Sequence, residues 1–148
     1  MPDGMTVLMA EDDQGHAALI ERNLRRSDVR NEIIQFGDGQ EVLNFLFRKG
    51  GNIQRVIGAS YVLLLDIQMP GVNGMEVLRD VKQDEELKKM PIVMLTTTAD
   101  PSTVEQCHAL GCSCYVTKPI EYDRFVDVIT QLGHFLNILQ LPQINGII

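Results

Sequence analysis

The chain has 148 residues, of which 45% are hydrophobic and 22% are charged, and its formal net charge is -7 at pH 7. This length suits one domain with a substantial core, and the composition is ordinary for a soluble globular protein. The acidic balance excludes the Lys- and Arg-rich surface that binds nucleic acid, and no apolar run approaches the roughly 20 residues that span a bilayer, so we expect neither nucleic acid nor a membrane as a partner.

The N-terminus lacks the basic segment and the apolar stretch of a secretion signal, which predicts a cytoplasmic protein. A reducing cytosol and an odd number of cysteines make a disulfide framework unexpected. Cys107, Cys112 and Cys114 lie near His108. Zinc sites pair two close ligands with a second pair farther along the chain, and no second pair follows here. We interpret the cysteines as buried structural thiols.

Apolar runs alternate with segments of helical spacing along the chain. The runs predict strands at 5–10, 32–36, 61–65, 92–95 and 114–117, and the segments between them predict helices at 15–27, 40–49, 74–83, 102–110 and from about 121 onward. The third and fourth runs are apolar without alternation, which is typical of strands covered on both faces. The order predicts an α/β fold, a doubly wound five-stranded parallel sheet with right-handed crossovers, formed by residues 1–148 as one domain.

Polar residues follow the predicted strands, at the sheet edge where doubly wound proteins bind ligands. They are Glu11, Asp12 and Asp13 after the first strand, Asp66 after the third, Thr96 to Thr98 after the fourth and Lys118 after the fifth. Carboxylates about 5 Å apart repel by roughly 3 kcal/mol at an effective dielectric of about 20, so acids on one rim require a cation. Oxygen ligands with open positions suit Mg²⁺, which together with a Lys and a Thr hydroxyl would stabilise a phosphoryl group in transfer. Asp66, ionised at neutral pH, would be the nucleophile and form an acyl phosphate.

The chain resembles the response-regulator receiver family over nearly its whole length. The motifs that carry the resemblance are VLMAED at 7–12, LLDIQMP at 64–70, GVNG at 71–74, MLT at 94–96 and YVTKP at 115–119. The resemblance implies a flavodoxin-like fold. It also implies that the protein is a phosphoacceptor of two-component signalling rather than an enzyme, and that a histidine kinase is its partner.

The resemblance assigns a role to each site residue. Asp66 accepts the phosphoryl group and shares in binding Mg²⁺, which Asp12 binds directly, Glu11 binds through water and Gln68 binds through its backbone carbonyl. Thr96, Thr97 and Lys118 contact the phosphate, Thr96 and Tyr115 are the switch residues, and the Lys118–Pro119 bond is cis.

A finer resemblance points to regulators that are paired with phytochrome-type histidine kinases. It is carried by the run at 84–91, the threonines at 96–98, the chain end at 135–142 and a long loop at 50–60. It implies a bacteriophytochrome as the phosphodonor.

Two residues near the acidic pair have open roles. Asp13 either touches the pocket or caps the first helix, and we favour the cap because Asp is preferred at helix starts. His16 is interpreted as a surface residue rather than a phosphodonor, because a lone His is a weak signal.

Two other functions fit the sequence less well. A phosphohydrolase of the haloacid-dehalogenase type needs a second Asp two residues after its nucleophile, where this chain has Gln68. Its nucleophile also follows the first strand, whereas Asp66 follows the third. A flavodoxin-like FMN-binding module must cradle a phosphate in its first loop, and the acids at 11–13 would repel it.

The C-terminal region, 121–148, predicts an extended last helix that ends at Pro142 and an apolar tail. One helix face cannot bury both its core stripe and a second set formed by Phe135, Ile138, Leu139 and Leu141. We expect this region to form a homodimer, with a tail folded back on its own domain as the alternative. No DNA-binding segment follows the last helix, so output is expected through protein contacts or onward phosphotransfer.

Overall fold

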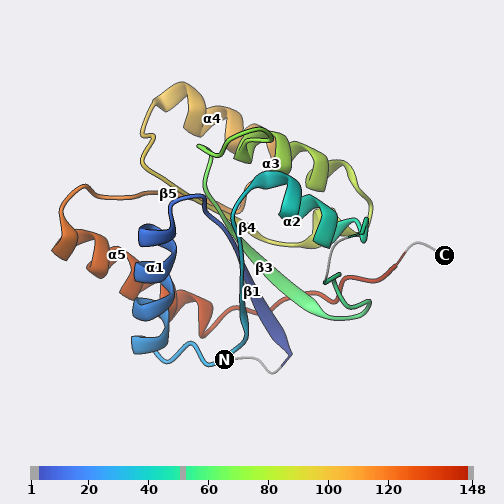
Figure 1. Ribbon diagram of the computed structural model, residues 1–148, viewed down its shortest axis with the longest axis horizontal. Coiled ribbons are helices and arrows are strands. Elements are labelled where there is room, and N and C mark those ends of the chain that lie inside the picture. Colours follow the sequence, from blue (N-terminus) through green and yellow to red (C-terminus); the bar gives the residue numbers. More distant parts are fainter. Residues whose placement is uncertain (1–3, 51–52, 147–148) are drawn as a thin grey trace.

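A parallel sheet with the strand order β2-β1-β3-β4-β5 forms the centre of the computed structural model, which describes residues 4–50 and 53–146 (Figure 1). The strands are β1 (Met5–Ala10), β2 (Ile33–Phe36), β3 (Ser60–Leu65), β4 (Ile92–Thr96) and β5 (Cys114–Thr117). The helices are α1 (Gln14–Arg26), α2 (Gly39–Leu46), α3 (Gly74–Gln83), α4 (Pro101–Leu110) and α5 (Tyr122–Leu136), with a short 3-10 helix, η1 (Leu87–Lys89). The predicted doubly wound sheet is confirmed.

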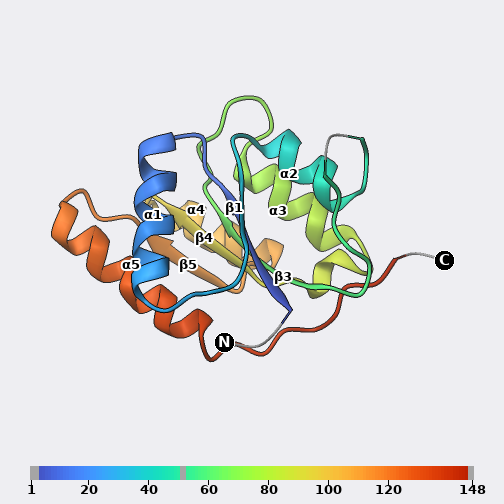
Figure 2. The same cartoon turned by 60° about the horizontal axis from the view of Figure 1, so that its bottom comes forward.

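The helices cover the sheet on both faces. Figures 1 and 2 show α1 and α5 on one face and α2, α3 and α4 on the other. Along β3, Leu63 and Leu65 pack into the core under α2 and α3, whereas Val62 and Leu64 pack into the core under α1 and α5. Because each side chain of this strand meets a core, its sequence is apolar without alternation.

The strand register brings the polar strand ends together. Ala10 of β1 lies beside Leu65 of β3, and Thr96 of β4 lies beside Thr117 of β5. Because all the strands run parallel, the residues that follow β1, β3, β4 and β5 emerge at one edge of the sheet.

The start of α1 is fixed by a side-chain cap. The Oδ1 atom of Asp13 accepts a hydrogen bond of 3.0 Å from the backbone N–H of His16, and this bond satisfies one of the free donors of the first turn. The capping role predicted for Asp13 is confirmed.

Close backbone packing fixes the start of α3. Gly74 donates its N–H to the carbonyl of Ile67, and a Cβ atom at Gly74 would collide with the carbonyl oxygen of Asp66. Glycine at this position therefore lets α3 begin directly against the loop that carries Asp66.

α1 ends one residue before its predicted end, and two other helices end three or more residues early. α2 ends at Leu46 because Arg48 adopts a left-handed φ of 57°, which cannot continue a helix. α5 ends at Leu136, where the side chain of Asn137 donates a hydrogen bond of 2.8 Å to the carbonyl of Ser27. This contact with the end of α1 turns the chain away from the helix axis.

Residues 137–146, which we call the C-terminal strap, cross from one face of the sheet to the other (Figures 1 and 2). Leu139 and Leu141 pack against the core under α1 and α5, whereas Ile144 is fully buried in the opposite core. Ile144 also exchanges backbone hydrogen bonds with Gly58 and Ala59. The tail thus folds back on its own domain up to residue 146, and Ile147 and Ile148 lie outside the described residues.

Within residues 4–50 and 53–146, the longest apolar stretch of helix is too short to cross a bilayer.

Candidate phosphoacceptor site

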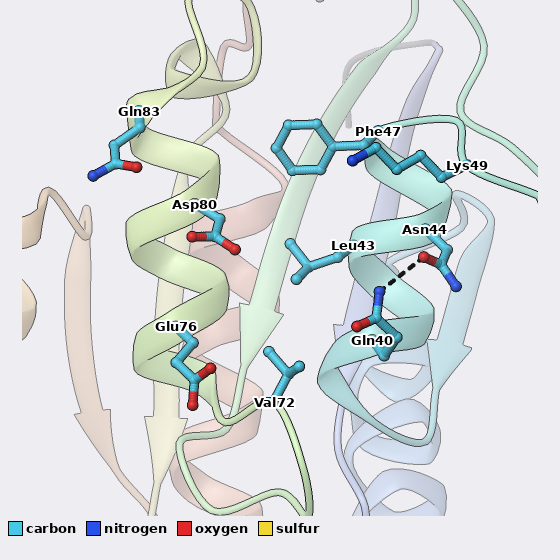
Figure 3. A pocket seen from close by; sticks show the side chains of 9 residues that line it. All are labelled: Gln40, Leu43, Asn44, Phe47, Lys49, Val72, Glu76, Asp80 and Gln83. Carbon is cyan, nitrogen blue, oxygen red and sulfur yellow. Dashed lines mark hydrogen bonds between the residues drawn. The ribbon is translucent and has the colours of Figure 1, made fainter.

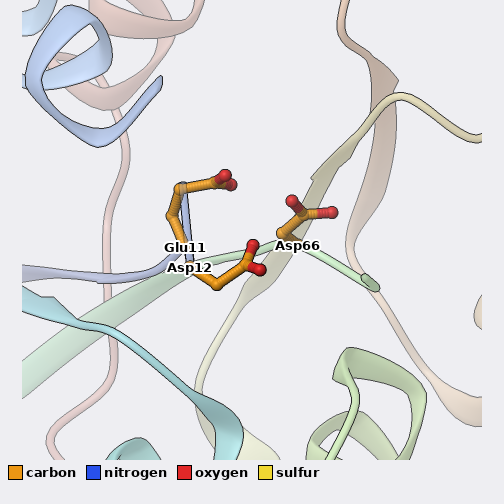
Figure 4. Close-up of side chains that lie close together, drawn as sticks. All are labelled: Glu11, Asp12 and Asp66. Atoms are coloured by element: carbon orange, nitrogen blue, oxygen red, sulfur yellow. The ribbon is translucent and has the colours of Figure 1, made fainter. Parts of the chain in front are cut away.

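Three carboxylates meet at the carboxyl edge of the sheet (Figure 4). Glu11 and Asp12 directly follow β1, and Asp66 directly follows β3. One oxygen from each of the three carboxylates lies within 4.8 Å of the others. Glu11 and Asp66 are each only 6% exposed, whereas Asp12 is exposed at the rim. The three carboxylates therefore lie together on one rim of the sheet, with Asp12 on the solvent side, and we call this cluster the carboxylate pocket.

A buried lysine joins the two buried acids. The Nζ atom of Lys118 lies 2.7 Å from Glu11 Oε2 and 3.1 Å from Asp66 Oδ2. The backbone N–H of Lys118 donates to the carbonyl of Thr96, which anchors the lysine at the end of β4. One ammonium stands against three carboxylates, so the pocket keeps negative charge that a cation would neutralise.

The buried acids differ in their pKa values. Burial, with the neighbouring Asp66 carboxyl, raises the pKa of Glu11 to about 7, although the Lys118 ammonium acts in the opposite direction. Burial alone would raise the pKa of Asp66, but hydrogen bonds from its neighbours and the charge of Lys118 hold it below its usual value. Asp66 is therefore the carboxylate that stays ionised at neutral pH and can act as a nucleophile.

Thr96 points a buried hydroxyl at the pocket. Its side chain is 0% exposed and its hydroxyl is close enough to Asp66 to lower the pKa of that carboxyl. Within the described part of the chain, however, the Thr96 hydroxyl meets no partner with hydrogen-bond geometry. A buried hydroxyl without a partner is costly, so this atom is suited to an oxygen that enters the pocket from outside.

The remaining predicted residues lie around this centre. Thr97 is exposed at the rim, and the Tyr115 hydroxyl donates a hydrogen bond of 2.6 Å to the carbonyl of Thr98. Gln68 donates its backbone N–H to Asp66 Oδ1 at 3.3 Å, and its side chain reaches Thr98 Oγ1 at 3.3 Å. The use of the Gln68 carbonyl as a metal ligand stays a prediction.

The predicted cis bond between Lys118 and Pro119 is wrong, because the described residues contain no cis peptide bond. The two isomers of a bond before proline differ intrinsically by only about 0.5–1 kcal/mol in favour of trans, so the local fold decides between them. Here the Lys118 side chain reaches both Glu11 and Asp66 with the bond in trans.

His16 is half-exposed, in line with the predicted surface position, and its ring also contacts the buried residues of the pocket. Its Nδ1 atom lies 3.3 Å from Lys118 Nζ and 3.5 Å from Glu11 Oε1, and its ring packs 5.8 Å from that of Phe125. The signal that could have located it is its place in the first turn of α1, where side chains point back towards the preceding strand end.

The cysteines lie away from this site. Cys107 and Cys112 are buried and Cys114 is half-buried, and burial raises the pKa of Cys112 to about 11. Among residues 4–50 and 53–146, the carboxylate cluster is the one group of His, Cys, Asp and Glu side chains with metal-site geometry. The interpretation as structural thiols is confirmed for Cys107 and Cys112.

A separate surface groove of about 360 Å³ runs between α2 and α3 (Figure 3). Leu43, Phe47 and Val72 form its apolar wall, and the Glu76 and Asp80 side chains of α3 face them. The groove shares no residue with the carboxylate pocket.

Known proteins resemble this chain along most of its length. Response regulator Rcp1 from Synechocystis sp. is 33% identical over 114 residues, which are 76% of this chain and 75% of Rcp1. A response regulator receiver domain from Rhodospirillum rubrum is 42% identical and superposes with a TM-score of 0.89, over 95% of this chain and 99% of that one. The bacteriophytochrome response regulator RtBRR is 39% identical with a TM-score of 0.72, over 93% of this chain and 82% of that one.

The structure of Rcp1 in its Mn²⁺-bound form superposes with a TM-score of 0.82 at 27% identity, over 93% of this chain and 98% of Rcp1. The family model of the response regulator receiver domain matches residues 7–130, which include all three carboxylates and Lys118. The chain belongs to the response-regulator receiver family.

Proposed function

We propose that this response regulator accepts a phosphoryl group from a histidine kinase on Asp66. The observation that carries the proposal is the buried Lys118 ammonium, which lies 2.7 Å from Glu11 and 3.1 Å from Asp66. Beside it is the Thr96 hydroxyl, which has no hydrogen-bond partner among the described residues. A negatively charged group on Asp66 would find both a cation and a hydroxyl donor in place.

The chemistry requires little of the protein beyond positioning. A carboxylate oxygen of Asp66 attacks the phosphorus of the kinase phosphohistidine, an O–P bond forms and the N–P bond breaks. The electron pair and a proton from solvent leave with the imidazole. Lys118 and Thr96 would contact the phosphoryl oxygens. In this proposal the protein assists its own phosphorylation and dephosphorylation and acts on no other substrate.

Mg²⁺ would be held by Asp12 and Asp66 directly, by the Gln68 carbonyl and by Glu11 through water. The donor set supports this assignment because it consists of hard oxygen atoms, one of them on the exposed Asp12, where water can complete the shell. The Mn²⁺-bound form of Rcp1 supports it from a relative. When bound, the ion neutralises the charge that develops on the phosphoryl group.

The test uses the whole protein, Mg²⁺ and a small phosphodonor such as acetyl phosphate. We expect one acid-stable, base-labile phosphoryl group, which mass spectrometry places on Asp66. The Asp66→Asn variant should take up none, and EDTA should abolish labelling of the wild type. Full labelling of Asp66→Asn, or labelling that EDTA leaves unchanged, would contradict the proposal.

The proposed kinase partner is a bacteriophytochrome. The likeness to RtBRR, at 39% identity over 93% of this chain, supports this partner. Phosphotransfer rates from a panel of purified histidine kinases would test it, and a clear kinetic preference for a sensor without a phytochrome module would overturn this part alone.

We also propose that the protein is a homodimer, associated through the exposed side of α5 and the start of the C-terminal strap. Phe135 is 42% exposed and Ile138 is 75% exposed. Because Ile144 is buried in the chain's own core, the predicted association surface of 121–148 narrows to these two side chains and their neighbours.

A further inference from the structure

The Lys118 ammonium has a third close neighbour besides the two acids. An ammonium carries three N–H donors, and here it donates to Glu11 Oε2 at 2.7 Å and Asp66 Oδ2 at 3.1 Å. The third close atom is His16 Nδ1 at 3.3 Å, which can accept when the ring proton is on Nε2. The lysine side chain is 1% exposed, so water has little access to the third donor. An acceptor at this place decides where the ammonium points.

The imidazole of His16 is itself held from several sides. Its backbone N–H is capped by Asp13 in the first turn of α1, and its ring packs 5.8 Å from the ring of Phe125, which is buried at the start of α5. The side chain is 39% exposed, so one side of the ring faces solvent while the other faces the pocket. A ring fixed in this way loses little entropy when it accepts a hydrogen bond.

The two nitrogen atoms of the ring have different roles. For Nδ1 to accept from the Lys118 ammonium, it must carry no proton, which places the proton of the neutral ring on Nε2. This tautomer keeps the close approach of His16 to Lys118 attractive.

We propose that His16 is a positioning residue, which orients the Lys118 ammonium for the phosphoryl group on Asp66. When the phosphoryl group enters, Lys118 must contact it without losing its own place between the acids. With His16 holding the third donor, the other two stay directed at Glu11 and at Asp66 or its phosphoryl oxygens. Without His16 that donor turns to water, and the ammonium is less well oriented for transfer.

The inference rests on the proposed phosphorylation of Asp66, so its test combines a rate with a measurement on the unphosphorylated protein. His16→Ala removes the acceptor, whereas His16→Asn places an amide oxygen near the position of Nδ1. Arg22→Ala, an exposed substitution on the same helix, is the matched control. The rate of Asp66 phosphorylation by acetyl phosphate is measured at saturating Mg²⁺ for the wild type and each variant.

We expect His16→Ala to slow phosphorylation roughly three- to tenfold, which corresponds to the loss of one hydrogen bond of ordinary strength. His16→Asn should restore the rate to within about twofold of the wild type, and Arg22→Ala should leave it unchanged. If His16 had a purely structural role, His16→Asn would not restore the phosphorylation rate in this way. Equal rates for wild type and His16→Ala, or equal losses in the Ala and Asn variants, would overturn the inference.

The second measurement is the ¹⁵N-detected signal of the Lys118 ammonium in the unphosphorylated protein. We expect its protons to exchange with water at least threefold faster in His16→Ala than in the wild type or His16→Asn. Unchanged exchange would refute the contact. Failure of the wild type to take up a phosphoryl group would instead refute the proposed function, while the ammonium signal would still decide whether His16 orients Lys118.

Discussion

Glu11 and Asp66 are two buried carboxylates that share the ammonium of one lysine. The contacts of Lys118 with both acids are close, but one positive charge cannot neutralise two buried carboxylates and the nearby Asp12. The raised pKa of Glu11 expresses this imbalance, because the pocket is more stable when that carboxyl keeps its proton. In metal-free protein, charge in the pocket therefore opposes folding at neutral pH and above.

This imbalance predicts how the stability of the metal-free protein depends on pH. The pKa of Glu11 is about 7 in the folded protein and near 4.5 in the unfolded chain, so between these values the folded state binds more protons. The free energy of unfolding should therefore fall as pH rises from 4.5 to 7, by a contribution on the order of 1–3 kcal/mol. Because the pKa of Asp66 is lowered in the folded protein, Asp66 changes the free energy of unfolding only in acid, below this pH window.

Urea unfolding in EDTA at pH 5 and pH 8 checks this prediction. Glu11→Gln, which cannot ionise, should lose most of the pH dependence and become more stable than the wild type at pH 8. Millimolar Mg²⁺ should stabilise the wild type at pH 8, because an ion that binds only the folded state shifts the equilibrium. If the free energy of unfolding changed equally between pH 5 and pH 8 in the wild type and in Glu11→Gln, Glu11 would not be the titrating group.

Single residues also show how far the sequence could predict the pocket. Asp66 was placed correctly because an acid directly after a buried strand must emerge at the sheet edge. The sequence does not predict the contacts of His16 with the pocket, because they join it to Lys118 and Phe125, which are about a hundred residues away along the chain. The Lys118–Pro119 isomer was predicted wrongly, since it depends on a small energy difference that the local fold decides.

At the scale of elements, strands were easier to predict than the ends of helices. β1 and β5 begin and end where their apolar runs do, and each is paired along its whole length with a neighbouring strand. The end of α5 depends instead on Asn137 and Ser27, whose hydrogen bond joins two helices far apart in sequence. Nothing in the local pattern between Leu136 and Pro142 marks that turn.

The C-terminal strap carries its own prediction, because a buried arginine holds it. The Arg55 guanidinium, 7% exposed, donates to the carbonyls of Leu46, Ile144 and Asn145 at 2.8, 3.3 and 3.0 Å. Arg55→Met keeps much of the apolar length but removes a donor from each of these carbonyls, of which that of Ile144 keeps the N–H of Gly58. We therefore expect a loss of about 2–4 kcal/mol in the free energy of unfolding. Ile144→Ala, which empties a core site, should lose about 2–5 kcal/mol.

Urea denaturation measures both losses, with Gln143→Ala as the control because its side chain is exposed on the same strap. The control should change stability by less than about 0.5 kcal/mol. The double variant should lose less than the sum of the single losses, since both residues act on one segment. Losses in Arg55→Met and Ile144→Ala as small as in the control would show that the strap is not part of the folded core in solution.

At the scale of the whole molecule, the strap changes which surface is left for a second copy of the chain. Phe135 and Ile138 are three residues apart and remain exposed, with Gln131 one helical turn before Phe135. Leu139 and Leu141, which the sequence assigned to the same surface, pack partly against the chain's own core. A stable interface buries about 800 Å² on each partner, so two apolar side chains must be the centre of a larger polar contact.

This smaller surface leads to a specific expectation for the proposed homodimer. A two-fold axis beside α5 would pair Phe135 and Ile138 of one protomer with the same residues of its partner, and two carboxylates introduced there would face two others across the axis. The double variant Phe135→Glu, Ile138→Glu should therefore be monomeric in sedimentation equilibrium at tens of micromolar, where the wild type should be dimeric. Val56→Glu, on an exposed apolar residue of the loop before β3, should stay dimeric. Truncation after Gln140 should instead lower the melting temperature, because it removes Ile144 from the core. A wild type that is monomeric both with and without phosphorylation would rule out the dimer.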